Sequence, residues 1–149
     1  MAVFAIAFGC GFVNAGRSPA DLEPFVATWV AHGQWSKIYD LMPPAQQKVI
    51  PYGKWYRCTL AGLLIAKGFG VDARSVRFVS AKVHPGTRPM TLPGTSVRVT
   101  ATVVSSTASL AEGGKRVNST AIDYWVELDG KWRRIDTNIA HYVKTSCGK

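Results

Sequence analysis

Apolar residues change their spacing at Gly70, and this change restricts the fold of the chain more than any other feature of its sequence. Before Gly70 they recur every three or four residues, as in the series Leu22, Val26 and Trp29, which is the spacing of one face of a helix. Beyond Gly70 four segments rich in β-branched and aromatic residues alternate in polarity, as half-buried strands do. These segments are Arg74–Val83, Thr95–Val104, Arg116–Leu128 and Lys131–Val143. Helices followed by strands that are connected in sequence order predict an α+β fold with N-terminal helices packed on an antiparallel sheet.

Proline and glycine divide the first half of the chain into helices. The first helix begins at Pro19 and ends at Gly33. A second helix stops at Pro43, and a third segment continues to Pro51. A last helix follows and ends at about Gly68. The 149 residues, of which 47% are hydrophobic, suit one domain with a core of its own.

The chain is basic, with 18 Lys and Arg against 9 Asp and Glu and a formal net charge of +9. A field of this sign favours anionic partners, such as acidic lipid headgroups, anionic wall polymers or nucleic acid. The basic residues are spread along the chain without a run of five, which is typical of a solvated surface. An anionic surface is therefore a candidate partner, whereas we do not expect nucleic acid.

Residues 1–16 form an uncharged apolar run, MAVFAIAFGCGFVNAG. Its length suits a signal peptide and is too short to span a bilayer. Val13 and Ala15 occupy the positions that a signal peptidase recognises, with cleavage before Gly16, whereas Cys10 in AFGC resembles a lipoprotein lipidation site. No Lys or Arg precedes the run, so a start farther upstream and a buried N-terminal segment stay open as alternatives. We expect an exported protein, periplasmic or at the cell surface, and tethered to the membrane if Cys10 is acylated.

Residues 17–149, which we expect to form the single domain, contain two cysteines, Cys58 and Cys147. An even number of cysteines is compatible with one disulfide in an oxidising compartment. The alternative is a pair of unrelated buried thiols. The sequence therefore predicts a pairing of Cys58 with Cys147 only if the protein is exported.

The Asp-Gly pair at 129–130 suits the two central positions of a type I′ turn. This turn would place Trp125 opposite Arg134 and Asp123 opposite Asp136 on one face of the hairpin. Facing carboxylates repel each other, so they require a shared proton or a cation, and Arg134 lies beside both. Two interpretations stay open: a proton-sharing dyad beneath a pocket, or a structural charge cluster centred on Arg134.

Other candidate residues lie on the predicted helices. Asp40, in the stretch KIYDLM, is a candidate general base, although a carboxylate there also suits an exposed helix end. The side chains that we expect to line a ligand pocket are Tyr39, Trp55, Tyr56, Trp125 and Arg134. An aromatic stripe at helical spacing is equally compatible with plain core packing. We find no ligands at a chelating spacing, no nucleotide motif and no nucleophile motif, and so predict neither a metal nor a cofactor.

Three stretches resemble the nuclear-transport-factor-2-like superfamily. FVATWVAHGQWSKIYDLMPPAQQ (Phe25–Gln47) and GKWYRCTLAGL (Gly53–Leu63) resemble its N-terminal helices, and YWVELDGKWRRIDT (residues 124–137) resembles its last hairpin. The likeness is nearest to the extracytoplasmic N-terminal domain of some penicillin-binding proteins. It implies a cystatin-like cone, in which helices and a strongly curved antiparallel sheet enclose a pocket at the wide end. Relatives include ketosteroid isomerases, polyketide cyclases, dehydratases and domains without catalysis, and many dimerise through the sheet.

We therefore expect a non-catalytic, exported domain at the cell envelope that binds a small apolar ligand or an envelope protein. The alternative is a small-molecule isomerase, dehydratase or cyclase. Its general base would be Asp40, or Asp123 together with Asp136, inside the cone. A cavity with a carboxylate on its wall is the feature that keeps this alternative open.

Overall fold

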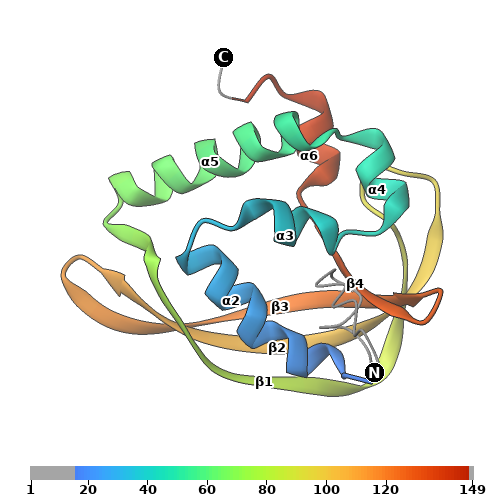
Figure 1. Cartoon of the computed structure of the whole chain (residues 1–149), viewed down its shortest axis with the longest axis horizontal. Helices are drawn as coiled ribbons and strands as arrows, with labels where there is room; N and C mark the ends of the chain where they lie inside the picture. Colours follow the sequence, from blue (N-terminus) through green and yellow to red (C-terminus); the bar gives the residue numbers. More distant parts are fainter. Residues whose placement is uncertain (1–15, 148–149) are drawn as a thin grey trace, which may run out of the picture.

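A computed structural model describes residues 16–147, in which five helices lie beside one antiparallel sheet of four strands (Figure 1). The helices are α2 (Pro19–Ala31), α3 (Trp35–Asp40), α4 (Pro44–Val49), α5 (Tyr52–Gly68) and α6 (Ile139–Lys144). The strands are β1 (Val71–Thr91), β2 (Arg98–Glu112), β3 (Lys115–Leu128) and β4 (Lys131–Ile135). The α+β fold expected from the sequence is confirmed.

The first helix begins and ends at residues that the sequence marks for those positions. The carboxylate of Asp21 accepts hydrogen bonds from the backbone N–H and the hydroxyl of Ser18, both at 3.1 Å. Pro19 follows as the first helical residue, where its missing N–H costs no hydrogen bond. Gly33 adopts a φ of +67° just beyond the helix, a conformation that glycine reaches without strain. Local chemistry thus fixes both ends of α2.

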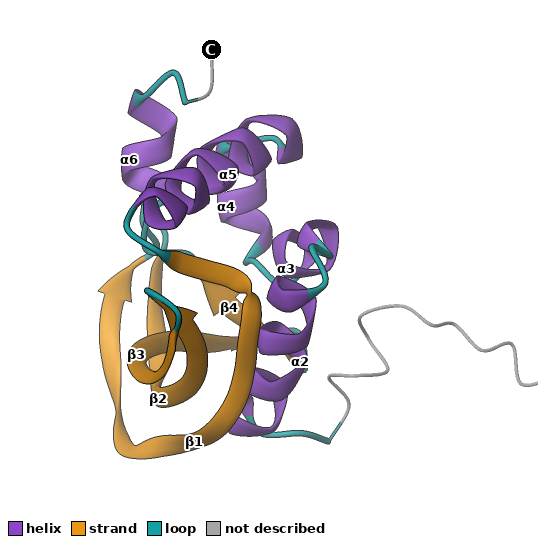
Figure 2. Cartoon of the chain, turned by 90° about the vertical axis from the view of Figure 1, so that its left-hand side faces the viewer, coloured by secondary structure: helices purple, strands orange, loops and turns teal. Residues whose placement is uncertain are grey.

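The four strands lie in the order in which they occur in the chain, each antiparallel to the next. Figure 2 shows the sheet curled on itself, with α2 and α3 along one side and α4, α5 and α6 across one end. The register between β1 and β2 shifts at three places, between Asp72 and Arg77, Phe78 and Ser80, and Val83 and Thr87. Such irregularities bend a strand and increase its twist, which accounts for the strong curl.

Strand β1 extends beyond Val83, where the sequence predicts that the strand ends. Pro85 and Pro89 belong to the strand, which continues to Thr91. Because β1 is an edge strand, it has a neighbouring strand on one side alone, and a proline without an N–H group is tolerated there. The predicted end at Val83 was wrong because proline excludes a residue from a central strand and not from an edge strand.

Strand β4 is shorter than the sequence predicts, since it ends at Ile135 and not at Val143. The backbone N–H of Asp136 donates to the side-chain oxygen of Gln46, and the Asp136 carboxylate accepts from the N–H of Asn138 at 2.8 Å. These bonds draw the backbone out of the sheet and into the turn before α6. The polarity alternation beyond Ile135 therefore belongs to a turn and a helix.

Two apolar clusters pack against the sheet. The larger contains Trp125 of β3, which is fully buried, together with buried side chains of the helices, among them Leu22, Trp29 and Trp55. The smaller surrounds Val126, whose side chain points to the opposite face of the strand. Burying a large apolar side chain stabilises the fold by about 1.5–3 kcal/mol, so the first cluster anchors the helices to the sheet.

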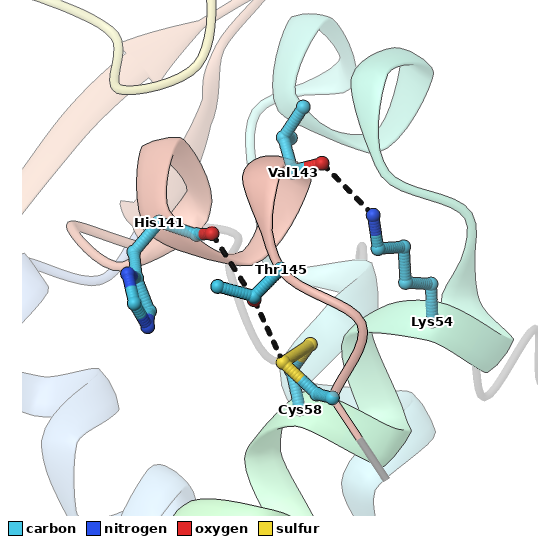
Figure 3. The surroundings of a disulfide bond; sticks show 6 residues. Lys54, Cys58, His141, Val143 and Thr145 are labelled. Carbon is cyan, nitrogen blue, oxygen red and sulfur yellow. Dashed lines mark hydrogen bonds between the residues drawn. A yellow bond between two sulfur atoms is a disulfide. The ribbon is translucent and has the colours of Figure 1, made fainter. Parts of the chain in front are cut away.

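A disulfide joins Cys58 of α5 to Cys147, which follows α6 (Figure 3). Beside it, the ammonium group of Lys54 donates to the carbonyl oxygen of Val143 at 2.9 Å, and the Thr145 hydroxyl donates to the carbonyl of His141. These contacts hold the C-terminal helix against α5.

The predicted signal peptide or lipoprotein segment lies outside the described residues, and so does its lipidation candidate, Cys10. Among residues 16–147, no helix combines the length and the apolar character needed to cross a bilayer.

Candidate functional site

The candidate site lies where β4 leaves the sheet, and the turn at 129–130 determines its geometry. Asp129 and Gly130 have φ values of 53° and 74°, as a type I′ turn requires. The resulting register pairs Trp125 with Arg134, as predicted from the sequence. Arg134 then reaches diagonally to Asp123, and its Nη2 lies 2.7 Å from Asp123 Oδ1. The side chains are 27% and 13% exposed, so this ion pair is largely removed from water.

A second carboxyl group, that of Glu23, lies beside the ion pair although it comes from α2. Glu23 is 3% exposed, and its Oε1 accepts a hydrogen bond of 2.8 Å from the indole Nε1–H of Trp125. The pKa of Glu23 is raised from 4.5 to about 7. Burial is the largest cause, and the charge of Asp123 and a hydrogen bond with Asp123 also raise the pKa, whereas the charge of Arg134 and the hydrogen bond from Trp125 lower it. Near neutral pH the Glu23 carboxyl group is therefore partly protonated.

Arg134 is the cation at the centre of this cluster. Burial lowers the pKa of its guanidinium group, but the carboxylates of Asp123, Glu23 and Asp136 raise it by more, so Arg134 stays charged. Its Nε–H is buried and has no acceptor among residues 16–147. A buried donor without an acceptor costs about 1–3 kcal/mol, which the ion pair with Asp123 and the packing around Arg134 must offset.

A cavity of about 220 Å³ adjoins the cluster. Asp123, Arg134 and Asp136 contribute to one part of its wall, and Thr59, Asn138 and Tyr142 are further polar lining residues. The apolar residues of the wall are Val26, Val30, Trp35, Ile38, Met42, Trp55, Ile122 and Ile135. Apolar and polar side chains thus contribute about equally to the wall of the cavity, and the charged groups lie together on one part of it.

Asp136 does not face Asp123 across the hairpin, which corrects the predicted dyad. Strand pairing ends at Tyr124 and Ile135, one residue short of the two aspartates. The Asp136 carboxylate instead accepts a hydrogen bond of 2.8 Å from the indole Nε1–H of Trp55. The carboxyl group that interacts with Asp123 is that of Glu23, because the turn after Ile135 directs Asp136 toward α5.

The five residues predicted to line one pocket are divided between several places. Trp55 and Arg134 line the cavity, whereas Tyr56 lines an adjoining groove beside the end of α5. Tyr39 donates its hydroxyl hydrogen to the carbonyl oxygen of Ile50 at 2.9 Å, and its ring packs against Trp55 at an interplanar angle of 56°. Trp125 is buried in the core and reaches the site only through Glu23. Tyr39 and Trp125 therefore support the cavity without lining it.

Asp40 lies at the exposed end of α3, not on the cavity wall. Its backbone carbonyl accepts a hydrogen bond of 2.8 Å from Arg133. The carboxyl group thus lacks the buried surroundings that a general base of this fold would need.

Glu23 is the site residue that sequence reasoning missed. A glutamate on a helix is usually exposed, yet this one lies three residues before Val26 and seven before Val30, at the spacing of the buried face. That spacing is the signal that identifies it. Buried carboxyl groups with shifted pKa values concentrate at functional sites, which makes Glu23 part of the candidate site.

Within residues 16–147, no three side chains of His, Cys, Asp or Glu lie close enough together to hold a metal ion. No protein-family model, curated protein or solved structure matches the chain. The site offers a charged donor, Arg134, to a hydrogen-bond acceptor, and the partly protonated carboxyl group of Glu23 lies near that donor.

Proposed function

We propose that the protein is a non-catalytic domain of the nuclear-transport-factor-2-like type that binds a small molecule in the cavity beside Arg134. The observation that carries this proposal is the guanidinium group of Arg134, which stays charged on the wall of a cavity of about 220 Å³. An apolar ligand body fits against Val26, Ile38 and Trp55. A carbonyl or ether oxygen of the ligand accepts the hydrogen bond from Arg134.

The charges on the cavity wall select an uncharged ligand. Asp123 and Asp136 lie on the same wall as Arg134, so an anionic ligand would meet two carboxylates for one guanidinium group. Arg134 is already paired with Asp123 at 2.7 Å. A neutral ligand avoids the repulsion and can still accept a hydrogen bond from the guanidinium group.

We further propose that the domain is exported and acts at the cell envelope. Support comes from the apolar run of residues 1–16 and from the disulfide between Cys58 and Cys147, since disulfides persist in oxidising compartments. The proposed family assignment is supported by the order of the elements, helices followed by a curled antiparallel sheet, and by the three stretches that resemble the superfamily.

A set of cyclic ketones and the matching cycloalkanes tests the binding proposal, with thermal unfolding as the measurement. The ketones are expected to raise Tm by mass action, and the cycloalkanes to raise it less, because only the ketones satisfy Arg134. Arg134→Met should weaken ketone binding by about tenfold, the value of one hydrogen bond from a charged donor. Arg133→Met is the matched control, since Arg133 does not line the cavity. The proposal would be contradicted if ketone and cycloalkane raised Tm equally, or if the two variants weakened ketone binding equally.

A second candidate function is proton transfer on a carbonyl compound, and the raised pKa of Glu23 is the observation that favours it. Asp123, on the cavity wall, would take a proton from the carbon next to the carbonyl group, while Arg134 stabilises the negative charge that develops on oxygen. The pair of Glu23 and Asp123 would then return the proton to carbon. Exchange of ketone α-hydrogens for deuterium, followed by NMR, tests this function. Loss of exchange in Asp123→Asn but not in Asp40→Asn is the expected result, and no exchange above the buffer rate rejects it.

A further inference from the structure

Three large apolar side chains at the C-terminal end of α5 are exposed. Leu64 is 69% exposed, Ile65 is 65% exposed, and Phe69, just beyond the helix, is 80% exposed. They are the three most exposed among the large apolar side chains of residues 16–147. A cluster of exposed apolar side chains on an otherwise well-packed domain marks a surface that binds another molecule or a membrane.

The apolar surface continues from these side chains into a groove of about 620 Å³ beside the end of α5. Leu60, Leu63 and Leu64 line the groove from α5, and Val71 lines it from the start of β1. The groove adjoins the cavity at Arg134, since Val30 and Trp35 line both, but the inference drawn from it does not depend on the function proposed for that cavity.

Basic side chains surround this apolar surface. Lys67 and Arg74 line the groove, and Lys115 and Arg116, the first residues of β3, follow the turn between β2 and β3. That turn is adjacent because the N–H of Gly113 donates to the carbonyl oxygen of Gly70 at 3.1 Å, and Figure 1 shows it at the same end of the molecule as the end of α5. This end of the molecule has four cationic side chains and two carboxylates, those of Asp72 and Glu112, and therefore carries a net charge of +2 (4 − 2).

We propose that the end of α5 is a membrane-docking element that inserts Leu64, Ile65 and Phe69 into an anionic lipid surface. Lys67 lies between Ile65 and Phe69 in sequence and would extend its ammonium group to the lipid phosphates, while its stem stays among the apolar chains. Lys115 and Arg74 would contact neighbouring headgroups. Apolar insertion together with attraction of basic residues to acidic lipid is the usual mode of interfacial binding.

The charge at this end favours a lipid surface over a second copy of the chain. A two-fold contact between copies would bring two identical positive patches together, and like charges in an interface are unfavourable. The formal net charge of +9 adds to this repulsion between copies and to the attraction toward acidic headgroups.

Sedimentation of the full chain with lipid vesicles tests the proposal. We expect binding to vesicles of phosphatidylcholine with phosphatidylglycerol, and much weaker binding to phosphatidylcholine alone. A variant with Leu64→Ser, Ile65→Ser and Phe69→Ser should lose affinity at least about tenfold, because three exposed apolar side chains no longer insert. Val97→Ser with Val143→Ser is the matched control, since these exposed valines lie elsewhere in the chain. All variants keep residues 1–16, so the difference between them isolates α5.

A local probe confirms that the same residues enter the lipid. In Phe69→Trp, the emission of the added tryptophan, taken as the difference from wild type, should shift to shorter wavelength with acidic vesicles and be quenched by brominated lipid. Unchanged emission would overturn the proposal, and so would equal vesicle binding of the triple-serine and wild-type proteins. A dimer in solution that the triple-serine variant abolishes would also overturn it, because a second copy would then cover this surface.

Discussion

The indole N–H of Trp125 donates a hydrogen bond of 2.8 Å to the carboxyl group of Glu23, two residues that are 102 positions apart in the chain. This contact joins the first helix to the third strand in the middle of the core. It also holds the Glu23 carboxyl group beside Asp123, where burial raises its pKa to about 7. One hydrogen bond thus links the stability of the fold to the protonation of the candidate site.

Glu23→Gln is expected to remove a pH dependence of stability. The folded pKa of Glu23, about 7, lies above its ordinary value of 4.5, so its contribution is fully present below about pH 4.5 and is lost as the pH rises to about 7. Relative to the Gln variant, wild type should lose on the order of 3 kcal/mol of unfolding free energy across this interval. Urea unfolding at a series of pH values measures it. Parallel pH profiles for the two proteins would show that Glu23 ionises normally.

Arg134→Met is expected to destabilise the protein by about 3 kcal/mol at neutral pH, because it leaves the carboxyl groups of Asp123 and Glu23 without their cation. Adding Asp123→Asn should recover part of the loss, which a double-mutant cycle of unfolding free energies will show. Arg133→Met removes one hydrogen bond to the Asp40 carbonyl and should cost about 1 kcal/mol. Equal costs for the two arginines would argue against a central role for Arg134.

Reduction of the disulfide is expected to lower the free energy of unfolding by about 4 kcal/mol, since the bond closes a long loop between residues separated by 89 positions. Chemical unfolding with and without reductant provides the measurement. Thiol titration of the unfolded, unreduced protein is the control: the expected count at Cys58 and Cys147 is zero, and two free thiols there would contradict the pairing.

Gly94→Ala is expected to destabilise the fold by about 1–3 kcal/mol, because it forces a strained backbone and an overpacked contact. Gly94 has a φ of +82°, and a Cβ atom there would lie 2.7 Å from Cγ2 of Ile139 at the start of α6. Gly62→Ala is the matched control: it lies within α5 with nothing within 4 Å, and should stabilise by about 0.5–1 kcal/mol. Thermal unfolding distinguishes the two, and a neutral Gly94 variant would show that the turn before β2 adapts.

The hairpin was predictable from sequence because its determinants are local. The pair at 129–130 selects one turn type, and this turn alone fixes the pairing of Trp125 with Arg134. The end of β4 was not predictable in the same way. The side-chain oxygen of Gln46 that binds the N–H of Asp136 comes from α4, 90 residues earlier in the chain, and no local pattern carries that information.

The residues of the candidate site divide in the same way, into those placed by local sequence and those placed by distant contacts. The ion pair of Arg134 with Asp123 follows from strand register, and the sequence predicted it. Glu23 enters the site through the packing of α2 on the sheet, and its only trace in the sequence is a spacing shared with Val26. A glutamate side chain is usually exposed to solvent. Here the hydrogen bond from Trp125 and the neighbouring Asp123 stabilise the Glu23 side chain inside the protein.

The two prolines of β1 have a consequence for the behaviour of the protein in concentrated solution. A free strand edge is a template on which further chains can assemble into fibrils, and assembly requires an unbroken row of N–H donors. Pro85 and Pro89 interrupt that row within the longest strand, and the charged side chains of Lys82 and Arg88 flank them. The strand that curls farthest around the molecule is thereby also the one that resists templating aggregation.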